Sequence, residues 1–372
     1  MTITEMGARA KEAARVLATA GALKEAALLH AAHALWSRRE EILAANAQDL
    51  EAGKGAGLSQ ALLDRLALTE GRIQDMKTAV EEVAKAADPV GRVLSGETRP
   101  NGLRIEKVAV PLGVIGIIYE ARPNVTSDAA ALCLKAGNAV ILRGGKEAIR
   151  SNKAVAGVLR DALEEAGLPA DCVQLVEDTS RQSAQELMGL TQYLDVLIPR
   201  GGAGLIRSVK ENARVPVIET GVGNCHVYVD ASADLDMAAE IIYNAKCSRP
   251  SVCNAIETIL VHQDAAKAAL PKIKARLDEK QVELRGCDRA RAILPGITPA
   301  VEEDWATEYL DYILAVKVVG SLEEALGHIA RYSTGHSECI VTRDYEKSRA
   351  FCRRIDAAAV YVNASTRFTD GF

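Results

Sequence analysis

The chain has 372 residues, more than one hydrophobic core usually organises, so we expect two domains. Hydrophobic residues make up 48% and charged residues 26%, and the low aromatic content of 4% favours a helix-rich α/β protein. The 45 Lys and Arg against 50 Asp and Glu give a net charge of −5 with no basic run, which excludes an ordinary nucleic-acid-binding surface.

No apolar stretch approaches the roughly 18 residues that span a bilayer, and residues 1–50 are charged and amphipathic rather than signal-like. Eight cysteines are scattered without a CxxC pair or a zinc-type spacing. We therefore expect a cytoplasmic protein with no metal site and no membrane partner, in which most thiols are small buried hydrophobes.

The N-terminal region is predicted to be helical, because Leu28, Ala32 and Leu35 fall on one helix face. These helices are expected to wrap a sheet rather than form it. Residues 94–110 contain two short extended runs around the turn-prone Pro100-Asn101-Gly102, which predicts a protruding β-hairpin.

Apolar runs then alternate with helical patterns. Strands are expected at 114–119, 139–142, 173–176, 196–198 and 217–218, with helices at 126–135, 147–166, 181–190 and 203–211. Such alternation indicates βαβ units and a parallel sheet covered on both faces, an architecture of the dinucleotide-binding type. After residue 230 it restarts, with strands at 256–261, 316–319, 339–341 and 359–362 and helices at 235–244, 264–279, 322–331 and 345–355. A second α/β domain is therefore expected, with a boundary near residue 230.

Two glycine-rich turns follow predicted strands of the first domain. One contains Arg143, Gly144, Gly145 and Lys146, and the other contains Gly201 and Gly202. Glycine permits close backbone approach, and the free N–H groups of a helix N-terminus attract phosphate. Neither turn is a G-x-G-x-x-G fingerprint, so a phosphate-bearing cofactor and a simple strand-to-helix turn both remain open.

Two further loops carry candidate catalytic residues. Glu219 follows the run at 217–218 and is either a general base or a turn cap. Cys253 lies in a polar loop, residues 248–255, which differs from the helical surroundings of Cys133 and Cys352. Such a loop can expose a thiol and lower its pKa, and the alternative is an inert, half-buried thiol.

Residues 111–116, the run at 140–143, Glu219-Thr220-Gly221 and the Cys253 loop resemble the aldehyde dehydrogenase superfamily in order and spacing. In that superfamily a Glu precedes the catalytic Cys, and the separation here, 253 − 219 = 34, is similar. More narrowly, residues 119–126, 248–255 and 362–371 resemble the γ-glutamyl phosphate reductase family, also called glutamate-5-semialdehyde dehydrogenase. This resemblance covers essentially the whole chain.

The resemblance implies NADPH-dependent reduction of L-glutamyl 5-phosphate to L-glutamate 5-semialdehyde and phosphate, the second step of proline synthesis from glutamate. Thiolate Cys253 would displace phosphate and form a thioester, which accepts hydride more readily than a carboxylate does. No water needs activation in this direction, so Glu219 either manages the Cys253 proton or only shapes the cofactor site. The alternatives are another aldehyde or acyl-CoA-type dehydrogenase of the superfamily, and an inactive scaffold.

The cofactor preference follows from charge. The superfamily's K-P-x-E segment, whose Glu holds the adenosine ribose in NAD enzymes, aligns with Arg143-Gly144-Gly145-Lys146. Because a Lys attracts a 2′-phosphate that a Glu would repel, we predict NADP(H). Glu308 resembles the Glu that holds the nicotinamide ribose, although the Phe-Gly-Pro that usually follows it is missing.

Substrate contacts are implied for residues near the nucleophile or in the family's last substrate loop. The candidates for the α-carboxylate are Arg249, Ser365, Thr366 and Arg367, and strand-end capping is the alternative for Ser365 and Thr366. Superfamily members carry an Asn oxyanion donor that is absent here. Either Arg122 or Asn124 replaces it, or Arg122 binds the substrate phosphate. His336 is a weaker candidate for the α-carboxylate, and an ordinary polar loop is the favoured interpretation of its segment.

The resemblance also implies a domain scheme. Residues 1–230 form an NADP-binding domain that includes the 94–110 oligomerisation hairpin, and residues 231–355 form a catalytic domain. Residues 356–372 lead toward an oligomerisation tail, since family members usually continue beyond this point. A homo-oligomer is expected, with functional coupling to glutamate 5-kinase.

Overall fold

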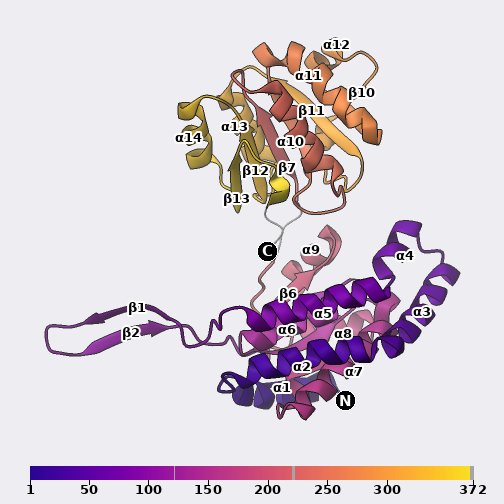
Figure 1. Cartoon of the computed structure of the whole chain (residues 1–372), viewed down its shortest axis with the longest axis vertical. Coiled ribbons are helices and arrows are strands. Elements are labelled where there is room, and N and C mark those ends of the chain that lie inside the picture. The colour runs from indigo at the N-terminus through magenta and orange to yellow at the C-terminus, as the bar shows by residue number, and fades with distance from the viewer. Residues whose placement is uncertain (121, 220–222, 369–372) are drawn as a thin grey trace. The chain divides into compact units, whose positions relative to one another are not determined.

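The computed structural model describes the chain apart from residues 121, 220–222 and 369–372 and the side chains of residues 61 and 203. The chain divides into two units, Met1–Thr220 and Gly221–Phe372 (Figure 1). Each unit has a parallel sheet with helices packed on it, which confirms the predicted α/β fold class. Among the described residues, no helix combines the length and apolar character that crossing a membrane requires.

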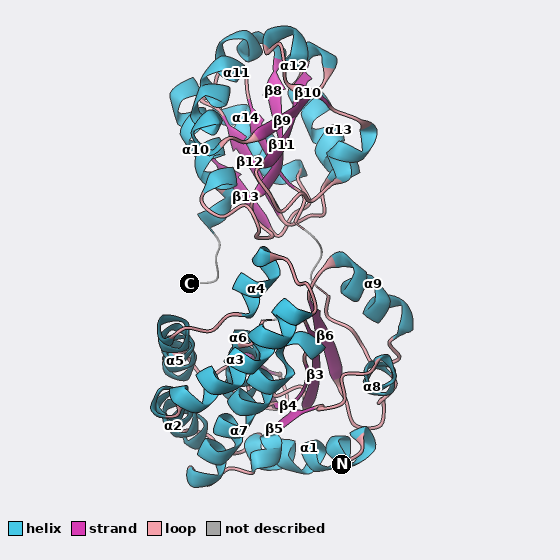
Figure 2. Ribbon diagram, turned by 90° about the vertical axis from the view of Figure 1, so that its right-hand side faces the viewer, coloured by secondary structure: helices cyan, strands magenta, loops and turns pink. Residues whose placement is uncertain are grey.

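The parallel sheet of the first unit has the strand order β5-β4-β3-β6 (Figure 2). Its strands are β3 (Val114–Tyr119), β4 (Ala139–Arg143), β5 (Val173–Leu175) and β6 (Val196–Arg200). Every residue of β3 is buried, because Ile115 and Ile117 pack into one hydrophobic cluster and Val114 and Ile118 into another. Burial on both faces explains why this strand is an uninterrupted apolar run. The helices are α1 (Ile3–Leu17), α2 (Leu23–Ser37), α3 (Arg39–Gly55), α4 (Gln60–Leu66), α5 (Glu70–Lys85), α6 (Asn124–Lys135), α7 (Ile149–Glu165), α8 (Arg181–Met188) and α9 (Ala203–Asn212).

The predicted hairpin is confirmed. Strands β1 (Val93–Thr98) and β2 (Arg104–Val108) pair antiparallel, and Figure 1 shows them projecting from the rest of the first unit. Gly102 occupies the turn with φ +84°, a conformation that glycine adopts without strain. All residues of both strands are exposed, including the apolar Leu94 and Ile105.

The second unit has a parallel sheet with the order β10-β9-β11-β8-β7-β12-β13. Its strands are β7 (Cys225–Val229), β8 (Ile256–His262), β9 (Glu283–Gly286), β10 (Thr298–Pro299), β11 (Ile313–Val319), β12 (Ser337–Val341) and β13 (Ala359–Val362). The helices are α10 (Leu235–Cys247), α11 (Gln263–Leu277), α12 (Asp288–Ile293), α13 (Leu322–Tyr332) and α14 (Tyr345–Arg354). Two hydrophobic clusters pack against its two faces, with Val227 in one and Tyr228 in the other.

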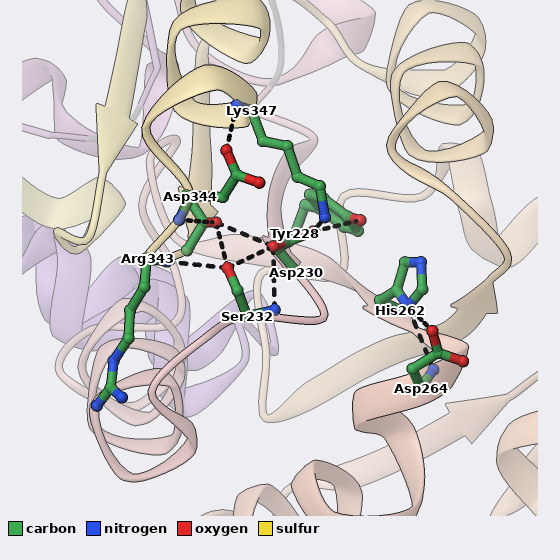
Figure 3. A network of polar contacts seen from close by, with 9 residues as sticks. Tyr228, Asp230, Ser232, His262, Asp264, Arg343, Asp344 and Lys347 are labelled. Atoms are coloured by element: carbon green, nitrogen blue, oxygen red, sulfur yellow. Dashed lines mark hydrogen bonds and ion pairs between the residues drawn. The ribbon is translucent and has the colours of Figure 1, made fainter.

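A polar network closes the carboxyl end of β7 (Figure 3). The buried Asp230 carboxylate accepts hydrogen bonds from the Ser232 hydroxyl at 2.7 Å, the Thr342 hydroxyl at 3.0 Å and the Lys347 ammonium at 2.7 Å. Burial alone would raise the pKa of Asp230, but these donors hold it well below its usual value. At the carboxyl end of β7, the polar side chains therefore bond one another and stabilise the fold.

Two sequence expectations differ from the structure. Residues 217–218 form no strand, and Val217 makes only an isolated bridge to Leu197. The strand that follows is instead β7, which pairs with β8 and β12 in the second sheet. For this reason the division between the units falls at 220/221, before the boundary that we predicted near residue 230.

Candidate active site

Cys253 lies in the turn that joins α10 to β8, at the amino end of the strand. It is partly exposed, whereas the adjacent Asn254 and Ala255 are buried. Most other thiols are buried, and burial raises the pKa of Cys133 and Cys339 to about 12, which makes them inert. Burial thus separates Cys253 from the core cysteines, and its contacts distinguish it from the other accessible thiols, Cys287 and Cys352.

Gly223 lies against the Cys253 loop, and sequence reasoning gave it no role. A Cβ atom at this position would lie 1.6 Å from the Cys253 carbonyl oxygen, so only glycine fits. The Gly223 N–H donates to Glu308 Oε1 at 2.8 Å, and the Cys225 thiol donates to the Cys253 carbonyl at 3.3 Å. The structure therefore brings Glu308 to the thiol loop through one glycine.

His336 was wrongly expected to lie in an ordinary polar loop. Its ring is hydrogen-bonded to the Cys253 side chain, and its Nδ1 is 2.9 Å from the Ser337 hydroxyl. The hydrogen bond to Cys253 raises the pKa of His336, burial opposes this, and the charges of Glu308 and Glu338 raise the pKa further. A Gly-His-Ser-Glu segment carries no sequence signal for a thiol that lies 336 − 253 = 83 residues away.

The segment after β13 turns back toward the thiol loop. Asn363 has φ +54°, and its side chain and backbone bond Thr342 and Ile340 at the end of β12. The buried Thr366 hydroxyl then donates to the Asn254 carbonyl at 2.7 Å, and the Arg367 guanidinium bonds the Asn254 side chain. Two predicted substrate residues therefore contact the residue next to Cys253.

The remaining predicted substrate residues show local contacts. Ser365 accepts a hydrogen bond from the Arg367 N–H at 3.2 Å, which is the capping geometry considered as its alternative. Arg249 is exposed in the thiol loop. In the first unit, Asn124 opens α6 and donates to Asp128 at 2.9 Å, and Arg122 precedes it, partly buried.

A buried ion pair supports the Glu308 segment. The Lys246 ammonium lies 2.5 Å from the Glu257 carboxylate, and both side chains are fully buried. Glu257 also accepts a 3.3 Å hydrogen bond from the N–H of Leu310, which holds φ +56°. Burial raises the pKa of Glu257 to about 7 and lowers that of Lys246, so each charge depends on the other.

We expect Glu257→Ala to lower the free energy of unfolding by about 3–5 kcal/mol, because it leaves the Lys246 charge buried and unpaired. Urea denaturation measures this loss. The double variant Glu257→Leu with Lys246→Met removes both charges and should regain most of it. A loss below about 1 kcal/mol in the single variant would show that the pair contributes little.

The predicted cofactor loops lie at the carboxyl ends of β4 and β6. Lys146 is exposed, while the Arg143 guanidinium bonds the Thr179 and Ser180 carbonyls at 2.7 and 2.9 Å. A Cβ at Gly144 would lie 2.2 Å from the Asn152 amide nitrogen, so packing inside the unit explains this glycine. Gly145 follows it and caps the short 3₁₀ helix Lys146–Ala148.

A carboxylate lies at the second glycine turn. The Gly202 N–H, at the start of α9, donates to Glu120 Oε2 at 3.0 Å, and a Cβ at Gly201 would lie 2.6 Å from the Glu120 carboxyl carbon. This turn thus presents a backbone donor to an anion, which is the property that a phosphate site needs. Glu219 is ion-paired with Lys210 of α9, and its neighbours 220–222 lie outside the described residues.

The predicted cofactor turns of the first unit therefore lie beyond the carboxyl ends of parallel strands, where ligands usually bind. In the second unit, Cys253, Gly223 and His336 lie at the amino ends of β8, β7 and β12, and Asp230 fills part of the opposite edge.

Comparison with known proteins agrees with this arrangement. Residues 1–313 match the model of the aldehyde dehydrogenase family. A gamma-glutamyl phosphate reductase of Heliobacterium modesticaldum is 62% identical over 98% of this chain and 88% of its own length, and one of Moorella thermoacetica is 62% identical over 100% and 89%. The crystal structure of gamma-glutamyl phosphate reductase from Thermotoga maritima matches with a TM-score of 0.96 and 51% identity, over 99% of this chain and 89% of that one.

These matches confirm the resemblance read from the sequence, and the family implies a nicotinamide cofactor and a small-molecule substrate. The chain belongs to the aldehyde dehydrogenase family and, within it, to the gamma-glutamyl phosphate reductases.

Proposed function

We propose that the protein reduces L-glutamyl 5-phosphate to L-glutamate 5-semialdehyde and phosphate with NADPH, the second step of proline synthesis from glutamate. The observation that carries this proposal is the partly exposed Cys253 thiol, hydrogen-bonded to His336, in a loop that Thr366 and Arg367 contact. High identity to relatives named for this activity supports it.

Cys253 is the proposed nucleophile. Its sulfur attacks the acyl carbon, the bond from that carbon to the phosphate oxygen breaks, and phosphate leaves with the electron pair. The resulting thioester carbon receives a hydride, and the C–S bond then breaks to release the aldehyde. The Cys253 backbone N–H is the donor that we assign to the developing oxyanion. Glu219 has no required step in this direction.

The substrate contacts are proposed on charge and position. Arg249 and Arg367 supply cations in and beside the thiol loop for the α-carboxylate, and Arg367 already bonds Asn254. Ser365 and Thr366 contribute hydroxyls from the same segment. Asn124, which opens α6, and Arg122, which precedes the helix, are the candidates for the oxyanion, and Arg122 is the alternative candidate for the substrate phosphate.

The phosphate-bearing part of the cofactor is proposed to bind the first unit, and the residues present fit a dinucleotide. Gly202 offers a backbone donor that already binds a carboxylate, and Gly201 permits close approach. Arg143, Gly144, Gly145 and Lys146 form the turn assigned to the adenosine end, and Glu308 is assigned to the nicotinamide ribose. When bound, the reduced nicotinamide supplies the hydride.

Lys146→Glu is expected to lower the preference for NADPH over NADH by about tenfold or more. The substitution replaces an attractive charge with a repulsive one at the proposed 2′-phosphate position, and each unit charge at 4 Å contributes about 1–4 kcal/mol near a surface. Steady-state kcat/KM with each cofactor measures the preference. Lys267→Glu, at an exposed position on α11, is the matched control. An unchanged preference in Lys146→Glu would remove Lys146 from the cofactor site.

We also propose a homo-oligomer in which the exposed hairpin β1–β2 takes part, since a two-stranded hairpin with apolar side chains in water is marginally stable alone. Functional coupling to glutamate 5-kinase would protect the labile acyl phosphate. A cytoplasmic location is proposed because the cysteines are free, as is usual in a reducing compartment.

The activity is tested by running the reaction in the reverse direction. The protein is incubated with glutamate 5-semialdehyde, phosphate and NADP, and NADPH formation is followed. Turnover that requires phosphate supports the proposal. Turnover without phosphate would instead indicate an aldehyde-oxidising enzyme. Turnover with CoA in place of phosphate would indicate a CoA-acylating enzyme, and cofactor binding without turnover would indicate an inactive scaffold.

A further inference from the structure

The thiol of Cys253 and the ring of His336 form a pair that the family resemblance did not supply. His336 lies in the loop that enters β12, and Cys253 in the loop that enters β8. Strand β7 separates these two strands in the sheet, and its first residue, Cys225, bonds the Cys253 carbonyl. The two loops therefore meet across the amino end of one strand.

The His336 ring is held in a fixed orientation. Its Nδ1 is 2.9 Å from the hydroxyl of the buried Ser337. The backbone on both sides is also fixed, because the Ala358 N–H donates to the Gly335 carbonyl at 2.8 Å and the Ala359 N–H to the His336 carbonyl at 3.1 Å. These hydrogen bonds fix the orientation of the His336 ring next to the Cys253 sulfur.

The charged groups around the ring favour its protonated form. Glu308 and Glu338 contribute negative charge, and the Cys253 thiolate would add a third. Glu338 is itself buried, where its carboxylate accepts hydrogen bonds from the Ser333 hydroxyl at 2.6 Å and the His226 N–H at 3.0 Å. The His226 ring lies 3.2 Å from the same Glu338 carboxylate. The Cys225 thiol, whose pKa burial raises, also lies on this side. The hydrogen bond to Cys253 and these charges raise the pKa of His336, although burial opposes them, so the ring beside the thiol is suited to accept a proton.

We propose that His336 takes the proton of the Cys253 thiol before acyl capture and returns it to the sulfur after the aldehyde has left. This inference rests on the proposed function. The S–H proton moves to the ring, and the thiolate forms the C–S bond as phosphate leaves with the C–O electron pair and takes a proton from solvent. After hydride addition the C–S pair returns to sulfur, which recovers the proton from the ring. The role that sequence reasoning left open for Glu219 thus passes to His336.

The test follows alkylation of Cys253 by iodoacetamide between pH 5.5 and 9.5 in the full chain, with peptide mass spectrometry. Exposed Cys352 in the same molecule serves as an internal reference. Without the ring, the thiol should ionise near its usual pKa of about 8.5. In His336→Gln we therefore expect the rate at pH 6.5 to fall by about tenfold relative to wild type, and the rates at pH 9.5 to be similar. His33→Gln, at an exposed position on α2, should leave both rates unchanged.

A His336→Gln profile that superimposes on the wild-type profile would overturn the inference. Ser337→Ala removes the hydroxyl next to Nδ1 of His336 and should shift the pH profile in the same direction, by less than His336→Gln does. If His336→Gln does not fold, an unshifted profile in Ser337→Ala would overturn the inference instead. The readout needs no substrate. If the variant profile is shifted but the protein fails the phosphate-dependent assay, the proposed function is rejected and the Cys253–His336 pair stands. If the profile is unshifted but turnover is intact, the pair is rejected and the proposed function stands.

Discussion

Cys253→Ser is expected to lower kcat/KM for the phosphate-dependent reaction by about 10⁴-fold or more. Ser is close in size, so the turn between α10 and β8 should keep its shape. A hydroxyl is scarcely ionised near neutral pH, however, and an oxoester accepts hydride less readily than a thioester. The variant therefore loses both the attack and the activation of the acyl group.

The control is Cys352→Ser, which changes an exposed thiol on α14 and should leave kcat/KM unchanged. A second measurement supplies glutamate, ATP and glutamate 5-kinase without reduced cofactor and searches for a glutamyl adduct on the Cys253 peptide. Substantial activity in Cys253→Ser, or an adduct on another cysteine, would reject Cys253 as the nucleophile.

Gly223→Ala is expected to lower kcat by about 100-fold, although the glycine carries no chemistry. The added Cβ would lie 1.6 Å from the Cys253 carbonyl oxygen, so the thiol loop or the 223–224 backbone must move. A displacement of about 1 Å in a reacting group is enough for such a loss. The same movement should weaken the 2.8 Å bond from Gly223 to Glu308, so the KM for the cofactor should rise as well.

Gly157→Ala is the matched control, because no atom lies within 4 Å of its added Cβ on α7. Alanine there should stabilise the helix by about 0.5–1 kcal/mol and leave turnover unchanged. Thermal unfolding separates a damaged site from a damaged fold. Normal kinetics in a folded Gly223→Ala variant would mean that the contact with Cys253 is not needed for catalysis.

Local patterns predicted elements with a continuous apolar run or a strong turn signal. The run that became β3 is continuous and apolar because helices cover the sheet, and Pro100-Asn101-Gly102 marked the hairpin by turn chemistry. Strand β7 was missed because His226 interrupts its apolar pattern. The buried ring of that histidine is hydrogen-bonded through Nδ1 to Glu338 of β12 at 3.3 Å, a contact between residues 112 positions apart.

The candidate site shows the same difference between local sequence patterns and contacts made by distant residues. Cys253 and Glu308 were predicted from motifs, each contained in one short segment. The partnership of Cys253 with His336, and the place of Gly223 between Cys253 and Glu308, depend on which strands are neighbours in the sheet. Strand order is a property of the whole unit, so no window of the sequence contains it.

The reversal at Asn363 has a consequence for how activity is lost. The bonds from Thr366 and Arg367 to Asn254 join positions more than a hundred residues apart, and they lie outside the ladder of the sheet. A segment joined to the thiol loop in this way can open locally at a lower free energy than the sheet unfolds. Under mild denaturant, catalysis would then disappear while circular dichroism and the slowest-exchanging amides of β7, β8 and β11 still report a folded core.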